Sequence, residues 1–363
     1  MKFFIVYVLL NHVQSIKFQS IIVFIFFVYK VLNWISILLN QTMDRKIKWG
    51  IAGLGKIAHK FAADLQRVEK AELIAVASTD WDRAKTFQKE FEGQNAYDSY
   101  TDLYHDPEVE IIYIASLNQN HISMTIEVLE AGKGVLCEKP LGLNPKEISM
   151  MIGLAKKQNC FLMEGLWSRF NPAIRKAKEW ITNGKIGVPR FLYAEFSFYL
   201  MNIDNYHRLM DPKKGGGVLL DIGVYPLFLA YLILGRPKNI KAQSIFAPTG
   251  VDIQTSIILQ YDNAQAVLYC GIANESDNNA KIGGTDGEVL LHGRWHNTQK
   301  VELIQAGESI QEDFPFEGNG YIPQIEEVNR CILAEKTESE LWSHQDALEL
   351  GLMVEEVFEK IKG

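Results

Sequence analysis

The hydrophobic pattern between residues 47 and 166 alternates between two kinds of segment. Short apolar runs typical of strands are separated by amphipathic stretches typical of helices. Strands are expected at 47–54, 72–78, 110–116, 134–138 and 161–166, and helices at 57–68, 82–91, 121–131 and 144–158. Strands that alternate with helices predict right-handed βαβ units and a parallel sheet with helices on both faces.

The pattern changes after residue 166. Helices are expected at 172–182, 215–234, 322–334 and 344–360, and strands at 190–199, 240–246, 255–261, 266–272, 287–292 and 300–305. The last five strands follow one another without helices, which predicts a mostly antiparallel sheet with one open face. The fold class is therefore α/β: an N-terminal Rossmann dinucleotide-binding domain, then a C-terminal α+β domain with a large, mostly antiparallel, open-faced sheet.

The first 42 residues differ from the rest of the chain. They contain three lysines and no Asp or Glu, and the run 21–39 is long enough to cross a bilayer. Lys30 near its middle makes insertion costly by about 2.5–3.5 kcal/mol. Met43 directly precedes the first strand. We interpret 1–42 as sequence upstream of the true start, with a membrane anchor as the alternative, 43–163 as the dinucleotide-binding domain and 164–363 as the substrate-binding and oligomerisation domain.

Charge and cysteine content narrow the class of protein. The net charge of −7 argues against a nucleic-acid binder, which would carry a basic surface. The four cysteines lie far apart, and no His stands at metal-ligand spacing from them. This pattern favours buried thiols in a reducing cytoplasm over a disulfide framework or a metal site. We expect a cytoplasmic protein without a metal, membrane-anchored only if 1–42 is retained.

A glycine-rich turn gives the strongest chemical signal. Gly53, Gly55 and Ala58 form a G-x-G-x-x-A motif between the first strand and the first helix, with Lys56 and Ile57 inside it. In this context, Gly53 permits the tight turn and Gly55 lets a pyrophosphate approach the backbone. The free N–H groups of the helix N-terminus then attract the phosphates. The sequence predicts dinucleotide binding by these residues.

The end of the second strand bears on the choice between NAD and NADP. An acidic residue there would bind the ribose 2′-hydroxyl and repel a 2′-phosphate. Ser78 stands in that place, followed by Thr79, with Arg83 nearby. This favours NADP, although no arginine directly follows Ser78 and Asp80 is close, so NAD stays open.

Two further motifs supply candidate catalytic groups. Glu138, Lys139 and a proline follow the fourth strand, where parallel sheets bind ligands. Three glycines at 215–217 precede Asp221 and Tyr225, which a helix would place on one face. Lys139 is expected to project toward a nicotinamide pocket, and the glycine loop to approach a substrate closely.

These motifs in this order resemble the glucose–fructose oxidoreductase/inositol dehydrogenase (Gfo/Idh/MocA) family, over residues 45–363. The segments 163–170 and 208–212 are similar to the branch with dimeric dihydrodiol dehydrogenases and NADP-dependent D-xylose dehydrogenases. The resemblance implies that Lys139, Asp221 and Tyr225 are catalytic, and that Asn118 and His121 lie in a loop against the nicotinamide ribose. Further candidate residues are Glu138 for the cofactor and Trp167, Arg169, His207 and Arg208 for the substrate.

The expected activity is hydride transfer between a nicotinamide and a sugar, polyol or trans-dihydrodiol. Tyr225 would take the proton of the substrate hydroxyl, with Lys139 as the alternative proton-transfer group and Asp221 orienting either Lys139 or the substrate. A non-catalytic dinucleotide sensor of the same fold is the rival function. Apolar residues on both faces of the second-half strands, such as 191–199, predict a homodimer or a dimer of dimers.

Overall fold

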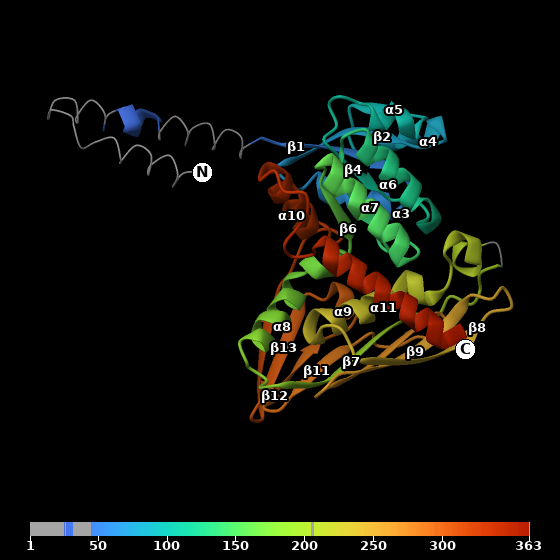
Figure 1. Cartoon of the computed structure of the whole chain (residues 1–363), viewed down its shortest axis with the longest axis vertical. Coiled ribbons are helices and arrows are strands. Elements are labelled where there is room, and N and C mark those ends of the chain that lie inside the picture. Colours follow the sequence, from blue (N-terminus) through green and yellow to red (C-terminus); the bar gives the residue numbers. More distant parts are fainter. Residues whose placement is uncertain (1–24, 26, 32–44, 205–206, 363) are drawn as a thin grey trace. The chain divides into compact units, whose positions relative to one another are not determined.

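The computed structural model describes residues 25, 27–31, 45–204 and 207–362. The predicted leader, with its apolar run 21–39, lies almost entirely outside the described residues. Ile47–Gly363 form one unit, which contains two sheets (Figure 1).

The first sheet is parallel and has six strands. Its strands are β1 (Ile47–Ala52), β2 (Ala71–Ala77), β3 (Asn95–Tyr97), β4 (Ile111–Ile114), β5 (Gly134–Glu138) and β6 (Leu162–Gly165). Their order, β3-β2-β1-β4-β5-β6, is that of dinucleotide-binding sheets. The order reverses between β1 and β4, so a ligand crevice is expected at the carboxyl ends of these strands.

Helices cover both faces of this sheet, as predicted. The helices are α3 (Lys56–Leu65), α4 (Trp81–Glu90), α5 (Tyr100–Tyr104), α6 (His121–Glu130) and α7 (Pro145–Gln158). Buried side chains of α3 and α4 share one core with the sheet, whereas α5, α6 and α7 share the other. The sequence pattern missed β3 and α5, because three and five residues are too few to show a period.

The second sheet has eight strands in the order β14-β13-β12-β11-β7-β10-β9-β8. The strands are β7 (Pro189–Ser197), β8 (Asn239–Phe246), β9 (Asp252–Gln260), β10 (Gln265–Gly271), β11 (Ala280–Gly284), β12 (Gly287–Leu291), β13 (Lys300–Gln305) and β14 (Glu308–Asp313). Every pair is antiparallel except β7 with β10, so the sheet is mostly antiparallel, as expected. The unpredicted strands are β11, which ends in two glycines, and β14, which is nearly all polar.

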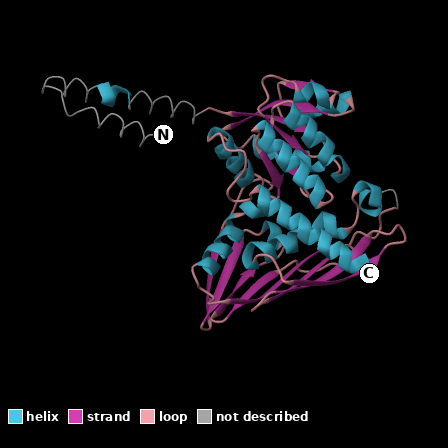
Figure 2. Cartoon of the chain, in the orientation of Figure 1, coloured by secondary structure: helices cyan, strands magenta, loops and turns pink. Residues whose placement is uncertain are grey.

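Helices lie on one face of the second sheet (Figure 2). They are α8 (Pro172–Thr182), which contacts β12 and β13, α9 (Val224–Leu234), which contacts β7 and β10, and α11 (His344–Lys362), which contacts β8. The opposite face exposes apolar side chains, among them Phe191, Ile258 and Val267 at 36–44% of their surface. The predicted open face is therefore present.

The stretch Pro212–Leu234 is the only described one that length and composition would allow to cross a membrane. It is not one continuous α-helix, because a π-helical turn over Leu219–Gly223 precedes α9. In the most apolar 18-residue window of this stretch, 72% is buried inside the protein. Its apolar character is that of a core helix beneath the second sheet.

The end of the chain returns to the first sheet. Trp49 of β1 donates its indole N–H to the Asn329 side chain of α10 (Ile322–Leu333) over 3.0 Å. The backbone N–H of Leu162 in β6 donates to the Thr337 carbonyl, also over 3.0 Å. Asp64 of α3 is fully buried and accepts the backbone N–H of Tyr321. The last segment thus completes the core of the dinucleotide-binding half, and the division at residues 163 and 164 stays a prediction.

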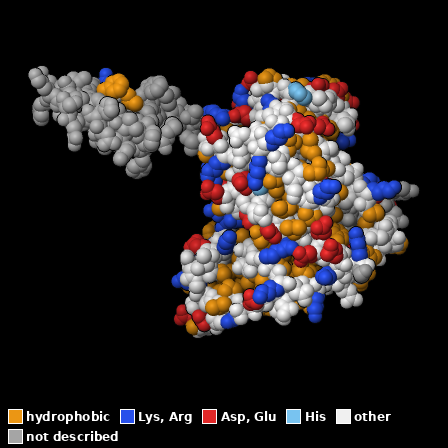
Figure 3. Space-filling view, viewed as in Figure 1, with side chains coloured by type: hydrophobic (Ala, Val, Ile, Leu, Met, Phe, Trp, Pro, Cys, Tyr) orange, Lys and Arg blue, Asp and Glu red, His pale blue; other side chains and the backbone are white. Residues whose placement is uncertain are grey.

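The distribution of surface charge and the burial of the cysteines agree with the expectations from the sequence. On the face shown in Figure 3, acidic and basic side chains of the described residues are interspersed over the whole described surface. All four cysteines are buried and free, as their spacing predicted.

Candidate active site

The candidate site residues gather where the strands of the first sheet end. Gly53 follows β1, Asn118 follows β4, Lys139 follows β5 and Trp167 follows β6. The carboxyl ends of parallel strands lie along one edge of a sheet. From the second half of the chain, the π-helical turn over Leu219–Gly223 adds Asp221, and the first turn of α9 adds Tyr225.

The glycine turn has the geometry that a pyrophosphate requires. Gly53 has φ +88°, and a Cβ there would lie 2.8 Å from the Ala115 carbonyl oxygen, so the turn needs glycine. A Cβ on Gly55 would meet nothing within 4 Å. No side chain caps the N-terminus of α3, and its first turn has no acidic residue. Open space beside uncapped N–H groups fits a dinucleotide phosphate.

Two alanine substitutions separate these roles. Gly53→Ala should lower the free energy of unfolding by about 1–3 kcal/mol, because it forces a side chain into a positive-φ turn against backbone. Gly55→Ala should leave stability within about 0.5 kcal/mol but weaken dinucleotide binding roughly 10-fold, since the methyl group enters the phosphate space. Urea unfolding and fluorescence titration measure the two effects. Equal stability losses would contradict the assignment.

The predicted ribose-binding residues lie at the end of β2. Ser78 is 2% exposed, and its hydroxyl accepts the backbone N–H of Asp80 over 3.2 Å. Thr79 and Arg83 are exposed. The Asp80 side chain caps α4 and lies 3.7 Å from the Arg83 guanidinium. The groups available to a 2′-phosphate are therefore Thr79 and Arg83, with Asp80 as a competing partner for Arg83.

Two predicted cofactor residues, His121 and Asn118, are hydrogen-bonded to other protein groups. His121 is fully buried, and its ring nitrogens lie 2.8 Å from the Pro140 carbonyl and 3.4 Å from the Ser116 carbonyl. Burial lowers the pKa of His121 to about 4, so the ring is neutral and donates through Nδ1 to the nearer oxygen. The Asn118 amide donates to the Gly215 carbonyl over 3.2 Å. His121 thus connects the loop after β4 with the loop after β5. Asn118 connects the loop after β4 with the glycine loop at 215–217.

Glu138 supports Lys139 from the interior. It is 9% exposed, and it accepts the Tyr113 hydroxyl over 2.5 Å and the backbone N–H of Lys139 over 3.3 Å. Burial raises the pKa of the Glu138 carboxyl, although the Tyr113 hydrogen bond opposes the rise. Its bonds fix the start of the loop that carries Lys139.

Lys139, Asp221 and Tyr225 are brought together as predicted. The Lys139 ammonium donates to the Asp221 carbonyl, lies 3.5 Å from the Asp221 carboxylate and sits 5.2 Å from the centre of the Tyr225 ring. The Arg208 guanidinium donates to the same carboxylate over 3.1 Å. Burial works to raise the pKa of Asp221, but Lys139 and then Arg208 hold it below its ordinary value. Asp221 is thus an anion that fixes two cations.

Tyr225 sits in an aromatic surrounding. It is 5% exposed, and its hydroxyl accepts the Trp167 indole N–H over 2.9 Å. Burial, and then the negative charge of Glu138, raises the pKa of Tyr225 above its ordinary value. The tyrosine therefore carries its proton at neutral pH in the free protein. Trp167 therefore lies beside Tyr225, and its role toward a substrate stays a prediction.

The other two substrate candidates are not part of this cluster. Arg169 is buried, and burial lowers the pKa of its guanidinium. The charged groups that also affect this pKa are Arg175, Asp346 and Glu327, and none of them belongs to the cluster. The His207 side chain accepts the backbone N–H of Leu209 and begins the short helix that carries Arg208.

Three residues of the cluster were not predicted. Phe196 of β7, His296 and Tyr321 lie around Tyr225 and Trp167. Phe196 belongs to the aromatic strand noted above, but the pattern did not indicate which face would meet the site. His296 lies in a helix of only three residues and Tyr321 directly precedes α10, and neither belongs to a motif that one sequence could reveal.

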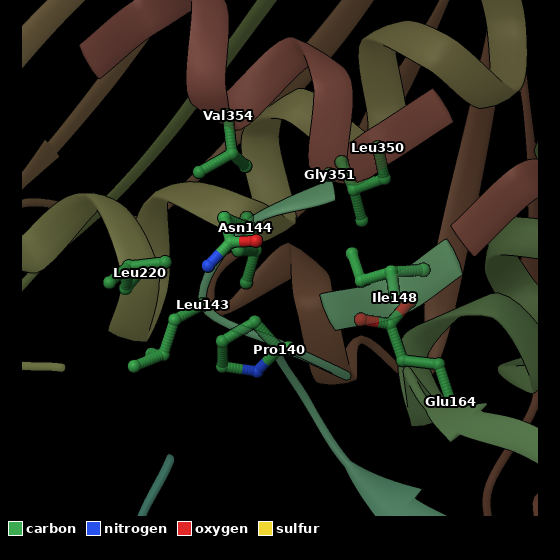
Figure 4. A pocket seen from close by; sticks show the side chains of 11 residues that line it. Pro140, Leu143, Asn144, Ile148, Glu164, Leu220, Leu350, Gly351 and Val354 are labelled. Atoms are coloured by element: carbon green, nitrogen blue, oxygen red, sulfur yellow. The ribbon is translucent and has the colours of Figure 1, made fainter. Parts of the chain in front are cut away.

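A small cavity lies behind the Lys139 loop (Figure 4). Its lining includes Pro140, Leu220, Val354 and the buried carboxyl of Glu164. Glu164 accepts the backbone N–H of Leu141 over 2.9 Å, and burial raises its pKa to about 7. Lys139, Asp221 and Tyr225 do not line this cavity, so it is separate from their cluster.

Comparison with known proteins extends the geometry. Residues 47–166 match a family model described as "Oxidoreductase family, NAD-binding Rossmann fold", and residues 174–290 match the GFO/IDH/MocA C-terminal domain. The chain is 38% identical over 280 residues to the trans-1,2-dihydrobenzene-1,2-diol dehydrogenase of Mus musculus, covering 76% of this chain and 82% of that protein. The Danio rerio enzyme of the same name is 32% identical over 323 residues, covering 85% and 95%.

A solved structure shares the fold. It is a 3-ketoreductase from Actinomadura kijaniata in complex with NADP and TDP-benzene, with a TM-score of 0.79 and 24% identity, covering 87% of this chain and 98% of that one. The glycine turn, the strand order and the matched family models agree on a nicotinamide dinucleotide as the cofactor. The chain belongs to the GFO/IDH/MocA family of NAD(P)-dependent oxidoreductases that act on hydroxyl or carbonyl groups.

Proposed function

We propose that the enzyme oxidises a secondary hydroxyl of a trans-dihydrodiol, sugar or polyol, or reduces the matching carbonyl, with Lys139, Tyr225 and Asp221 as its catalytic group. The observation that carries the proposal is the position of the Lys139 ammonium, between the Asp221 carboxylate and the Tyr225 ring. The relatives named for trans-dihydrobenzenediol support the first of these substrates.

In this proposal the protein handles the proton, and a bound nicotinamide supplies or accepts the hydride. Tyr225 hydrogen-bonds the substrate oxygen and gives it a proton on carbonyl reduction. Its raised pKa suits a donor, because the proton is held at neutral pH. Lys139 stabilises negative charge on that oxygen, and Asp221 holds Lys139 in place. Lys139 as the proton donor, with Tyr225 positioning the substrate, remains the alternative.

A substrate panel tests the proposed function. Purified enzyme is incubated with NADP⁺ or NAD⁺ and a trans-dihydrodiol, xylose, glucose or inositol, and reduced cofactor is followed at 340 nm. Turnover of at least one hydroxyl substrate is expected. A protein that binds the dinucleotide but turns over no member of the panel, in either direction, would contradict the proposal.

NADP is the cofactor we propose, on the chemistry at the end of β2. No acidic side chain follows the strand directly, and the exposed Thr79 and Arg83 can meet a 2′-phosphate. His121 and Glu138 act in this proposal by holding the loops around the cofactor, since their polar atoms bond within the protein.

Replacing Arg83 separates the two cofactors. Arg83→Ala should raise the KM for NADP⁺ by about 10-fold, the scale of one charge-assisted phosphate contact, and change that for NAD⁺ by less than about 2-fold. Initial rates with each cofactor measure the effect, and Lys89→Ala, on the same helix, is the control. Equal changes for both cofactors would indicate that Arg83 does not meet the 2′-phosphate.

We propose further that the enzyme is a cytoplasmic homodimer joined through the open face of the second sheet. Strand register places Tyr193, Val267 and Ile258 side by side across β7, β10 and β9 on that face. Ile258 and Val267 are exposed, and apolar areas of this kind favour association. A twofold contact would bury the face against its copy.

Light scattering tests the assembly. The wild-type protein should have the mass of two or four chains, and Ile258→Glu with Val267→Lys should shift it toward one chain, because both charges enter the proposed contact. Exchange of the exposed Val188, outside the strand, for Lys is the control. A wild-type mass of one chain at every concentration would contradict the dimer.

A further inference from the structure

His296 packs against the ring of Tyr225. It lies in a short helix, Trp295–Asn297, whose position is fixed because the Ser168 hydroxyl donates to the His296 carbonyl over 2.6 Å. The imidazole stacks on the Phe196 ring at 4.0 Å between centroids and lies 5.5 Å from the Tyr225 ring. Among the described residues, His296 is the histidine whose imidazole packs against Tyr225, and in the proposed function the Tyr225 hydroxyl meets the substrate.

The hydrogen-bonding capacity of this imidazole is unused. His296 is 9% exposed, and its Nδ1 is buried with no hydrogen-bond partner among the described residues. Burial, and then the charges of Arg294 and Lys139, lowers its pKa to about 3, so the ring is neutral and carries one donor and one acceptor. Buried polar groups are nearly always paired, so the unpaired Nδ1 leaves a hydrogen bond available to a ligand or to an ordered water.

The surroundings of His296 describe the shape of that ligand. The Trp167 ring meets the His296 imidazole edge-on, with 6.1 Å between ring centroids. The Tyr321 ring stacks on Trp167, with 5.3 Å between their centroids. With Phe196 these rings form aromatic walls, while the polar groups are Tyr225, Lys139 and the imidazole. Such walls suit a ring with an apolar face. In the proposed function, the adjacent Tyr225 and His296 side chains would face hydroxyls on neighbouring carbons of such a ring.

We propose that His296 binds the hydroxyl next to the reacting carbon and so makes the site selective for cyclic vicinal diols over isolated secondary alcohols. This inference rests on the proposed function, in which Tyr225 and Lys139 meet the reacting oxygen. A site built to pair a second hydroxyl discriminates strongly against a substrate that lacks it, since its own polar group is then left unpaired.

Two alcohols that differ by one hydroxyl test the proposal. The kcat/KM values of wild-type enzyme for trans-cyclohexane-1,2-diol and cyclohexanol give a selectivity ratio, expected to exceed about 10. His296→Phe keeps a stacked ring without nitrogen, and should lower the ratio by about 10- to 100-fold through the diol alone. His296→Gln keeps a polar group and should retain more of the ratio. His292→Phe, whose imidazole contacts Glu302 outside the cluster, should leave it unchanged.

The ratio is taken within each variant, so partial loss of folded enzyme cancels. A wild-type ratio near 1, or an unchanged ratio in His296→Phe with both substrates slowed alike, would overturn the role of His296 while the oxidoreductase function stands. Absence of turnover by the wild-type enzyme across the whole substrate panel would instead overturn the proposed function. Dinucleotide binding by each variant, followed by fluorescence, confirms that the first half of the fold is intact.

Discussion

Substituting Lys139 by Met is expected to lower kcat by about 10²-fold or more while dinucleotide binding persists, which is the usual scale for an electrostatic or acid–base group. Methionine keeps an unbranched stem that is one atom shorter than that of lysine, but it loses the charge beside Tyr225. The Asp221 carboxylate then keeps only Arg208 as its cation. Steady-state rates in both directions and a fluorescence titration with reduced cofactor measure the two effects.

A second lysine gives the matched control for this substitution. Lys156 is exposed on α7, so Lys156→Met should leave kcat within about 2-fold. If Lys139→Met instead turns over at the wild-type rate, the ammonium has no part in the reaction. If it loses dinucleotide binding as well, Lys139 supports the fold of the loop after β5 and its catalytic role is unsupported.

Tyr225→Phe should also lower kcat by about 10²-fold, because the ring remains and only the hydroxyl is lost. That hydroxyl accepts the Trp167 indole N–H, so its removal also leaves this donor without its acceptor. In the reductive direction the donor must be protonated, and a raised pKa keeps it so through neutral pH. The wild-type kcat for reduction should therefore stay flat to alkaline pH.

The pH–rate profile distinguishes the two candidate proton donors. If Tyr225 transfers the proton, wild-type kcat for oxidation should rise with pH into the alkaline range, because the raised pKa keeps Tyr225 protonated below it, and the residual activity of Tyr225→Phe should lose that rise. An unchanged profile would assign proton transfer to Lys139. Tyr231→Phe, on the same helix, removes a hydroxyl that bonds Asp346 over 3.0 Å outside the site and should retain wild-type activity.

The elements whose hydrophobic pattern repeats over several residues could be predicted from the sequence. The alternation of strands and helices up to residue 166, and the glycine turn at Gly53, depend on local sterics and periodicity. Elements too short or too polar to show a period, such as β3 and β14, could not be predicted. Neither could the π-helical turn over Leu219–Gly223, because its extra residue is set by packing and leaves no mark in the spacing.

The candidate site divides in the same way. Lys139, Asp221 and Tyr225 belong to motifs, and the structure brings their side chains together. Phe196, His296 and Tyr321 come from three separate segments of the second half, and only tertiary packing gathers them around Trp167. Arg169 and Arg208 were equal candidates in the sequence, but only Arg208 pairs with Asp221, since the loop before the glycine triplet approaches it.

The return of the last segment to the first sheet has a consequence for synthesis on the ribosome. The β6 carboxyl of Glu164 accepts the indole N–H of Trp342, about 180 residues later in the chain. At roughly 5–20 residues per second, the dinucleotide-binding half therefore waits about 10–35 s for its final contacts. During that interval the nascent chain exposes Trp49 and the apolar edge beside β6 without α10 and α11.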